Sequence, residues 1–233
     1  MNTHNRKAII DDGMNPNFVK GADLEGIFQI PIIKAPKHIF IPNNIVPFTF
    51  RNKEPKSTND AIGFYEMDVN FSKILIEPDI CINEMRPFGA MITPDASLYR
   101  NAPLTAQITN IYRNRAIGYY AQRKGLYVIP QIRWGTETTY TTKVLPEKVA
   151  FLGAPKHSIL AIGTYGCING KDNKYHFKAG LEEMLFELEP SDVLVYGSMP
   201  DSVFADYLNC TKFHQYDDWV TLKKGGANNN GKR

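Results

Sequence analysis

The feature that most constrains the fold is an alternation of short apolar segments with longer amphipathic segments, which begins at residue 61. Apolar runs typical of strands lie at 61–66, 88–93, 126–132, 158–163 and 192–196. Several of the segments between them carry apolar residues at three- and four-residue spacing, the pattern of a helix with one buried face. Strands that alternate with helices favour βα units around a parallel sheet. We therefore predict an α/β protein with a compact or incomplete βα barrel-like fold and a mainly parallel sheet; an open doubly wound sheet is the alternative.

The strongest helix prediction covers about residues 104–124. Pro103 suits the first turn of this helix and Gly125 supplies its end. Its apolar stripe is formed by Ile108, Ile111, Tyr112, Arg115 and Tyr119. We predict further helices around 71–76, 179–189 and 200–209, and a last strand over 213–219.

Two segments carry mixed signals. Pro130 lies inside the predicted strand at 126–132 and indicates an edge position or a bulge, because proline cannot donate to a strand ladder. The threonine-rich segment 136–142 predicts either an extra strand or an ordered loop.

The 233 residues suffice for one large domain with a core of its own. Residues 1–25 are polar and interrupted by glycine and proline, so we predict an arm along the surface. Residues 26–222 form the predicted single α/β domain. Residues 223–233 contain no apolar side chain except Ala227 and predict a disordered tail.

The composition is that of an ordinary globular protein, with 43% hydrophobic and 22% charged residues. No apolar run reaches the roughly 18–20 residues of a membrane-spanning helix, and Ala8, Ile9 and Ile10 are too few for a secretory signal. Three cysteines without a CxxC motif fit a reducing compartment. We therefore expect a cytoplasmic protein without a membrane partner. A net charge of +3 is too small to indicate nucleic-acid binding.

Sequence motifs for cofactors and metals are absent. The five histidines show no HxxxH or HxH spacing, so we predict no metal site. Neither GxGxxG nor GxxxxGK[ST] occurs, which leaves a Rossmann cofactor or a P-loop nucleotide site without support. The absence of GxSxG gives no indication of a serine hydrolase of the α/β type. The sequence assigns no cofactor and no oligomeric state.

Polar side chains follow the predicted strands at the ends where parallel α/β proteins place their active sites. Asp68 and Asp95 each follow a strand and are the predicted catalytic residues, because two carboxylates can divide acid and base roles. They could also hold a divalent cation. The structural alternative is turn and N-cap chemistry, which suits both positions.

Seven further residues are predicted to bind substrate. Arg113 and Arg115 can each bind a phosphate or carboxylate with two hydrogen bonds. Because Arg115 lies on the apolar stripe, we expect it to be buried and paired with Asp95 or Asp68. Such a pair could be purely structural or could belong to the site. The aromatic and polar helix positions Tyr119 and Gln122 could line a pocket or belong to the core. The remaining candidates follow strands: Arg133, Trp134 and Tyr196. Trp134 could stack on a sugar or a base, or simply close the barrel mouth.

Several short motifs together resemble those of an uncharacterised family, domain-of-unknown-function family 4417, found in bacteria, phages and mobile elements. They are Phe64-Tyr65 with Asp68, Pro94-Asp95-x-Ser97-x-Tyr99, Pro103, Tyr112-Arg113-Asn114-Arg115-x-x-Gly118, Val128-Ile129-Pro130, Trp134 and Tyr196-Gly197. The resemblance covers most of residues 61–198. It implies a phage or mobile-element context, hence the cytoplasm of a host cell, and it implies no particular reaction. Ala96 and Met67 depart from the family pattern, and Met67 replaces a common acidic residue, which weakens the metal hypothesis.

Three functional hypotheses follow. The first is an enzyme whose strand-end pocket acts on a phosphorylated, nucleotide or glycosidic substrate. The second is a non-catalytic nucleic-acid-binding accessory protein, suggested by the basic and aromatic helix over residues 112–124. The third is a structural or host-interaction protein in which the Asp and Arg side chains form a buried network. We favour the first, in which the partner is a small molecule or nucleotide.

Overall fold

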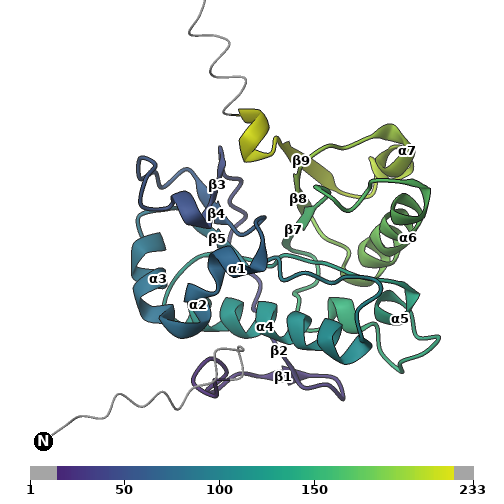
Figure 1. The fold of residues 1–233 in the computed structure, drawn as a ribbon, viewed down its shortest axis with the longest axis horizontal. Coiled ribbons are helices and arrows are strands. Elements are labelled where there is room, and N and C mark those ends of the chain that lie inside the picture. The colour runs from purple at the N-terminus through teal and green to yellow at the C-terminus, as the bar shows by residue number, and fades with distance from the viewer. Residues whose placement is uncertain (1–14, 223–233) are drawn as a thin grey trace, which may run out of the picture.

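The computed structural model describes residues 15–222, and within them it shows a mixed α/β fold with two parallel sheets (Figure 1). The first sheet has the order β3-β4-β5-β6 and the second the order β7-β8-β9. All strand pairs within these two sheets are parallel, as predicted. The strands of the first sheet are β3 (Ile45–Pro47), β4 (Ala61–Gly63), β5 (Ala90–Ile92) and β6 (Val128–Ile129). Those of the second are β7 (Ile159–Gly163), β8 (Asp192–Tyr196) and β9 (Lys212–Tyr216).

The two sheets meet at Pro130. Val128 and Ile129 pair with β5, and β6 is therefore the edge strand of its sheet, as Pro130 indicated. Beyond it, Gln131 forms a single parallel bridge to Ala161 of β7. The Pro130 carbonyl accepts a hydrogen bond from the Ala161 N–H (2.9 Å), and the Ile132 N–H donates to the Ala161 carbonyl (2.8 Å). Because no ladder joins β3 to β9 in the described part of the chain, no closed barrel is present there.

Helices cover the outer faces of both sheets (Figure 1). Outside the first sheet lie α1 (Asp68–Phe71), α2 (Lys73–Ile76) and α3 (Pro78–Met85), and outside the second lie α6 (Lys171–Leu188) and α7 (Asp201–Phe204). The long helix α4 (Leu104–Arg123) runs below both, and α5 (Glu137–Tyr140) lies near its far end. Residues 15–222 also contain three 3-10 turns: Phe48–Phe50, Val149–Phe151 and Ala205–Tyr207. None of the helices in residues 15–222 is both long and apolar enough to cross a membrane.

Of the four apolar clusters in the described residues, three hold the sheets and their helices together, and the fourth joins β2 to α4 through Ile30 and Ile111. One lies between the first sheet and its helices and includes Phe64, Ile82 and Ile117. A second lies between the other sheet and α6 and includes Leu160 and Leu181. The third brings together inward-facing residues of six strands from both sheets: Ile45, Ala61, Ala90, Ile92, Ile129, Ile159, Ala161, Leu194 and Tyr196. The inner faces of the two sheets therefore pack against each other, which disagrees with an open doubly wound sheet covered by helices on both faces.

The predicted arm, residues 1–25, is described from residue 15 onward, and the part before it lies outside the described residues. Phe18 is fully buried against the first sheet's helices. The short antiparallel pair β1 (Leu24–Glu25) and β2 (Ile30–Pro31) lies below α4 (Figure 1). The predicted tail, 223–233, lies outside the described residues, and the single-domain boundaries remain a prediction.

Most predicted elements are present, but several differ in kind or extent. Helix α3 was not predicted, and the strand predicted over 213–219 is β9, which ends at Tyr216 and is followed by a helical turn from residue 219. Residues 136–142 contain the one-turn helix α5 and not a strand or a plain loop, because Glu137 to Tyr140 close a helical turn. Helix α6 begins at Lys171, eight residues before its predicted start at 179. The pattern did not reveal this start because the first turns of α6 are polar and partly exposed to solvent, without regularly spaced apolar residues.

Candidate active site

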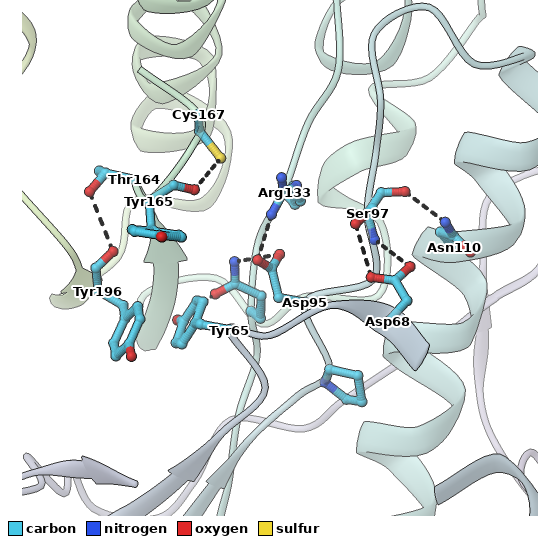
Figure 2. Close-up of polar contacts among 12 residues, drawn as sticks. Tyr65, Asp68, Asp95, Ser97, Asn110, Arg133, Thr164, Tyr165, Cys167 and Tyr196 are labelled. Carbon is cyan, nitrogen blue, oxygen red and sulfur yellow. Dashed lines mark hydrogen bonds and ion pairs between the residues drawn. The ribbon is translucent and has the colours of Figure 1, made fainter. Parts of the chain in front are cut away.

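A partly buried ion pair lies at the carboxyl ends of β5 and β6. Arg133 Nη1 lies 2.5 Å from Asp95 Oδ2, and Gln131 Nε2 donates to Asp95 Oδ1 at 3.1 Å (Figure 2). Asp95 is 8% exposed; Arg133 balances its charge, and the Gln131 amide donates a hydrogen bond to its other oxygen. Burial lowers the pKa of Arg133, but the neighbouring Asp95 carboxylate more than offsets this and leaves that pKa above its ordinary value. Arg133 is therefore a permanent cation at this position.

Tyr65 fixes the orientation of the Gln131 amide. Its hydroxyl donates to Gln131 Oε1 at 2.7 Å, so the amide NH2 group is turned toward Asp95. The Tyr65 ring stacks on Tyr196, with centroids 4.2 Å apart and planes 5° apart (Figure 2). Burial, and then the Asp95 charge, raise the pKa of Tyr65 well above its ordinary value, so the phenol stays protonated and remains a donor.

Gly163, the last residue of β7, is required by this arrangement. A Cβ atom there would lie 2.9 Å from the Tyr65 ring and 3.6 Å from Asp95 Oδ2. The first distance is shorter than carbon atoms tolerate. The second sheet therefore approaches the ion pair through a glycine backbone.

A second layer of side chains supports the ends of β5 and β6 from behind. The Thr93 hydroxyl accepts the Gln131 N–H (2.8 Å) and donates to Asn114 Oδ1 (3.0 Å). Asn114 Nδ2 in turn donates to the Pro94 carbonyl (2.7 Å). These bonds replace the strand ladder where it ends, and they hold the backbone that carries Asp95 and Arg133.

Arg115 belongs to this supporting layer and is 1% exposed. Its guanidinium donates to the carbonyls of Leu152, Gln131 and Ala150 and to Asn114 Oδ1, at 2.5–3.1 Å. The predicted burial is therefore confirmed. The expected ion pair with Asp95 or Asp68 is not formed among the described residues, because neutral oxygens take all of these hydrogen bonds. Burial lowers the pKa of Arg115 to about 10, which still leaves it charged at neutral pH.

A cavity of about 450 Å³ opens beside the ion pair, between the loop after β5, the end of β6 and the start of α6. Arg100, Arg133 and His176 contribute basic groups, and no Asp or Glu is among its lining residues. The remaining walls are amide, glycine and apolar or aromatic: Leu98, Tyr99, Asn101, Ile132, Trp134, Gly135, Gly163, Gly166, Cys167, Asn173 and Phe177. The lining thus combines donors for an anion with apolar surface for the rest of a ligand.

Of the two predicted catalytic residues, Asp95 adjoins this cavity and Asp68 contacts a loop. Both Asp68 oxygens accept hydrogen bonds from Ser97, one from its N–H (3.1 Å) and one from its hydroxyl (2.9 Å) (Figure 2). Asp68 therefore holds the loop that follows Asp95. The N-cap alternative is not observed for either residue: no side chain caps α1, and no helix begins at Asp95.

Apart from Arg115, the predicted binding residues fall into two groups. Arg133 and Trp134 line the cavity, and Tyr196 supports Tyr65. Trp134 is only 8% exposed, with its indole N–H bonded to the His176 carbonyl, so most of its ring is a wall. The other group lies along α4: Arg113 donates to Asn110, Tyr119 to the Lys20 carbonyl, and Gln122 pairs with the backbone of Lys34. None of this second group lines the cavity.

Sequence reasoning missed five contributors: Tyr65, Arg100, Gln131, Cys167 and His176. Tyr65 and Gln131 follow strands, so the same strand-end rule could have found them. Arg100 and His176 come from the middle of a loop and from a helix, and no sequence signal places them together. Cys167 is not an activated thiol, because burial raises its pKa.

No group of three or more potential ligands among the His, Cys, Asp and Glu side chains of residues 15–222 could hold a metal ion. The three cysteines are all unpaired.

Comparison with known proteins finds a matching family and similarity to two mycobacteriophage proteins. A family described as "Domain of unknown function (DUF4417)" matches residues 22–217. The Gene 1 protein of Mycobacterium phage L5 is 29% identical over 200 residues, which are 83% of each chain. The Gene 1 protein of Mycobacterium phage D29 is 28% identical over 191 residues, 81% of this chain and 66%, just under two thirds, of the phage protein. No solved structure matches the chain.

Proposed function

This chain belongs to the DUF4417 family, and from that premise we propose that it is an enzyme acting on a small phosphorylated substrate, such as a nucleotide or a sugar phosphate. The observation that carries the proposal is the cavity lined by Arg100, Arg133 and His176 with no carboxylate among its walls. Arginine is suited to phosphate because its planar fork offers two parallel N–H donors. The volume of about 450 Å³ lies within the range typical of small-molecule sites.

We propose different roles for the two predicted catalytic carboxylates. Asp95 adjoins the cavity through its bond to Arg133 and is the group for proton transfer. Asp68 is a positioning residue, because both of its oxygens bond Ser97, which does not line the cavity, whereas the Asp95 partner Arg133 does. This division disfavours a glycosidic substrate, since most glycoside hydrolases need two carboxyl groups flanking one bond.

The finer fold assignment is also a proposal. The inward-facing cluster drawn from both sheets, and the single bridge between Gln131 and Ala161, support an incomplete βα barrel with its opening between β3 and β9. In barrels of this type the carboxyl ends of the strands carry the active site. The family context and the three unpaired cysteines support a place of action in the cytoplasm of a host cell.

Thermal shift measurements with nucleoside monophosphates, sugar phosphates and their unphosphorylated counterparts test the proposal. A ligand that binds the native state raises its melting temperature. We expect a rise only with phosphorylated compounds, its loss in Arg133→Gln, and its retention in Arg86→Gln, which removes an equal charge from an exposed position outside the cavity. Asp95→Asn should keep binding and lose turnover of the compound that binds.

Two results would contradict the enzyme proposal. If phosphorylated and unphosphorylated compounds shift the melting temperature equally, the basic lining does not select the ligand. If only oligonucleotides shift it, and added salt removes the shift, the protein is a nucleic-acid-binding accessory.

A further inference from the structure

The carboxylate of Asp172 lies at the rim of the cavity between two of its basic groups. Its Oδ2 atom is 2.5 Å from Arg100 Nη1, and its Oδ1 atom is 3.8 Å from His176 Nε2. Asp172 does not line the cavity, and its side chain is 74% exposed, whereas those of Arg100 and His176 are 31% and 20% exposed. An anionic side chain therefore reaches from solvent to the place where the lining offers the Arg100 guanidinium and the His176 imidazole as hydrogen-bond donors.

The two basic groups are held in place without help from Asp172. Arg100 Nη2 donates to Asn173 Oδ1 at 2.7 Å, and Asn173 is itself fixed by a bond from its Nδ2 to the Asn169 carbonyl (2.7 Å). His176 Nδ1 lies 3.2 Å from the Tyr140 hydroxyl, which leaves Nε2 turned to the Asp172 side. Removal of the Asp172 carboxylate would therefore leave Arg100 and His176 in the same positions.

We propose that Arg100 and His176 form the subsite for the substrate phosphate, and that Asp172 occupies it as an internal anion until the phosphate displaces it. This inference rests on the proposed function and assigns the position of the phosphate. An ion pair with one partner this exposed contributes little, so its exchange costs little. A phosphate monoester carries more charge than a carboxylate and has three acceptor oxygens, so it can bond both donors at once.

The internal anion also predicts selectivity. A ligand carboxylate that entered the subsite would replace one carboxylate by another and gain little. A phosphate gains charge and hydrogen bonds on exchange. We therefore expect the wild-type protein to bind phosphate and to show little affinity for acetate. Because both ligands must displace the same carboxylate, both should bind more tightly when Asp172 is neutralised.

Calorimetric titration with inorganic phosphate and with acetate at pH 7.5 tests the inference. Asp172→Asn should bind phosphate about two- to fivefold tighter than the wild type, because the competing charge is gone. Arg100→Gln should bind it about tenfold or more weakly, and Arg100→Gln with Asp172→Asn should bind no tighter than Arg100→Gln alone. Asp206→Asn is the matched control, because Asp206 is similarly exposed and paired, with Lys178, outside the cavity; its affinity should equal that of the wild type.

The outcomes separate this inference from the proposed function. If the wild type binds phosphate and Arg133→Gln weakens it, but Asp172→Asn binds no tighter, the displacement inference is overturned and the proposed function stands. Equal tightening by Asp206→Asn would also overturn it, since the effect would then reflect net charge. If phosphate binds none of the variants, both proposals fail. Melting temperatures of all variants establish that each protein is folded.

Discussion

The two halves of the molecule obtain their order in different ways. In the half built on β7–β9, each strand has five residues, and every residue of β7 and β8 is buried, so ladder hydrogen bonds and apolar packing define the backbone. In the half built on β3–β6, the strands have only two or three residues. There, side chains such as Thr93, Asn114 and Arg115 continue the hydrogen bonding where the ladders stop. The half with short strands carries Asp95, Arg100 and Arg133. The charged groups of the candidate site thus lie on a backbone that is held in place by hydrogen bonds from polar side chains.

The largest expected loss comes from the apolar half. Leu181 of α6 is fully buried, and Leu181→Ala should lower the free energy of unfolding by about 3 to 5 kcal/mol, through lost burial and the cavity left behind. Urea denaturation measures it. Because Leu181 does not line the cavity, phosphate affinity of the folded variant should be unchanged. A weakened phosphate affinity would show that apolar packing in the β7–β9 half also positions the residues of the cavity.

Arg115→Met should lower the free energy of unfolding by about 2 to 4 kcal/mol. The variant leaves four oxygen acceptors without their donor, an effect partly offset because a charge is no longer buried. Unlike Leu181→Ala, it should also weaken phosphate binding, because Arg115 bonds the Gln131 carbonyl directly behind the ion pair. A loss below about 1 kcal/mol in urea denaturation would mean that polar side chains do not hold this half.

Two buried threonines allow a matched comparison between the halves. Thr93→Val should cost about 2 kcal/mol, because it removes a donor to Asn114 and leaves the buried Gln131 N–H without its acceptor. Thr164→Val, in the other half, should cost about 1 kcal/mol, since it removes one good bond, from the hydroxyl to the Ser198 carbonyl (2.9 Å). Thermal or urea unfolding of both variants gives the difference. Equal losses would argue that the threonine in the short-strand half has no special role.

The smallest effect concerns the contact between β9 and the chain before β3. Tyr216 donates to the Pro42 carbonyl at 2.6 Å, and burial raises its pKa to about 12. The unfolded chain releases this proton near pH 10, so the native state binds more protons above that pH and stability falls as pH rises from 10 to 12. One such tyrosine contributes a slope of up to about 1.4 kcal/mol per pH unit. Tyr216→Phe should unfold with a shallower dependence on pH over this range and cost about 1 kcal/mol at pH 7; an unchanged slope would contradict the burial of this hydroxyl.

Sequence reasoning predicted the half with long strands more closely. The segments 158–163 and 192–196 are continuous apolar runs and correspond to β7 and β8 within one residue. The predicted strand at 126–132 contains only two ladder residues, because the chain exchanges its partner strand at Pro130. The hydrophobic pattern of the sequence indicates which residues are buried, but it does not indicate where the hydrogen-bond ladder between two strands ends.

The residues of the candidate site also differ in how far the sequence could predict them. Asp95 and Arg133 were predicted because their positions follow directly from strand ends. Arg100 and His176 were not, since their proximity depends on how a loop of one half meets a helix of the other. The partners of Arg115 could not be predicted at all, because backbone carbonyls exist at every position and carry no sequence signature.

The single bridge at Gln131 and Ala161 has a consequence for how the molecule opens. The cavity takes Arg100 and Arg133 from one side of this junction and His176 from the other, so a small hinge movement there would separate the basic groups while both sheets stayed intact. A bound ligand would restrain that movement. Amide hydrogen exchange at residues 131–134 should therefore slow when ligand binds, while exchange in the centres of β7 and β8 changes little.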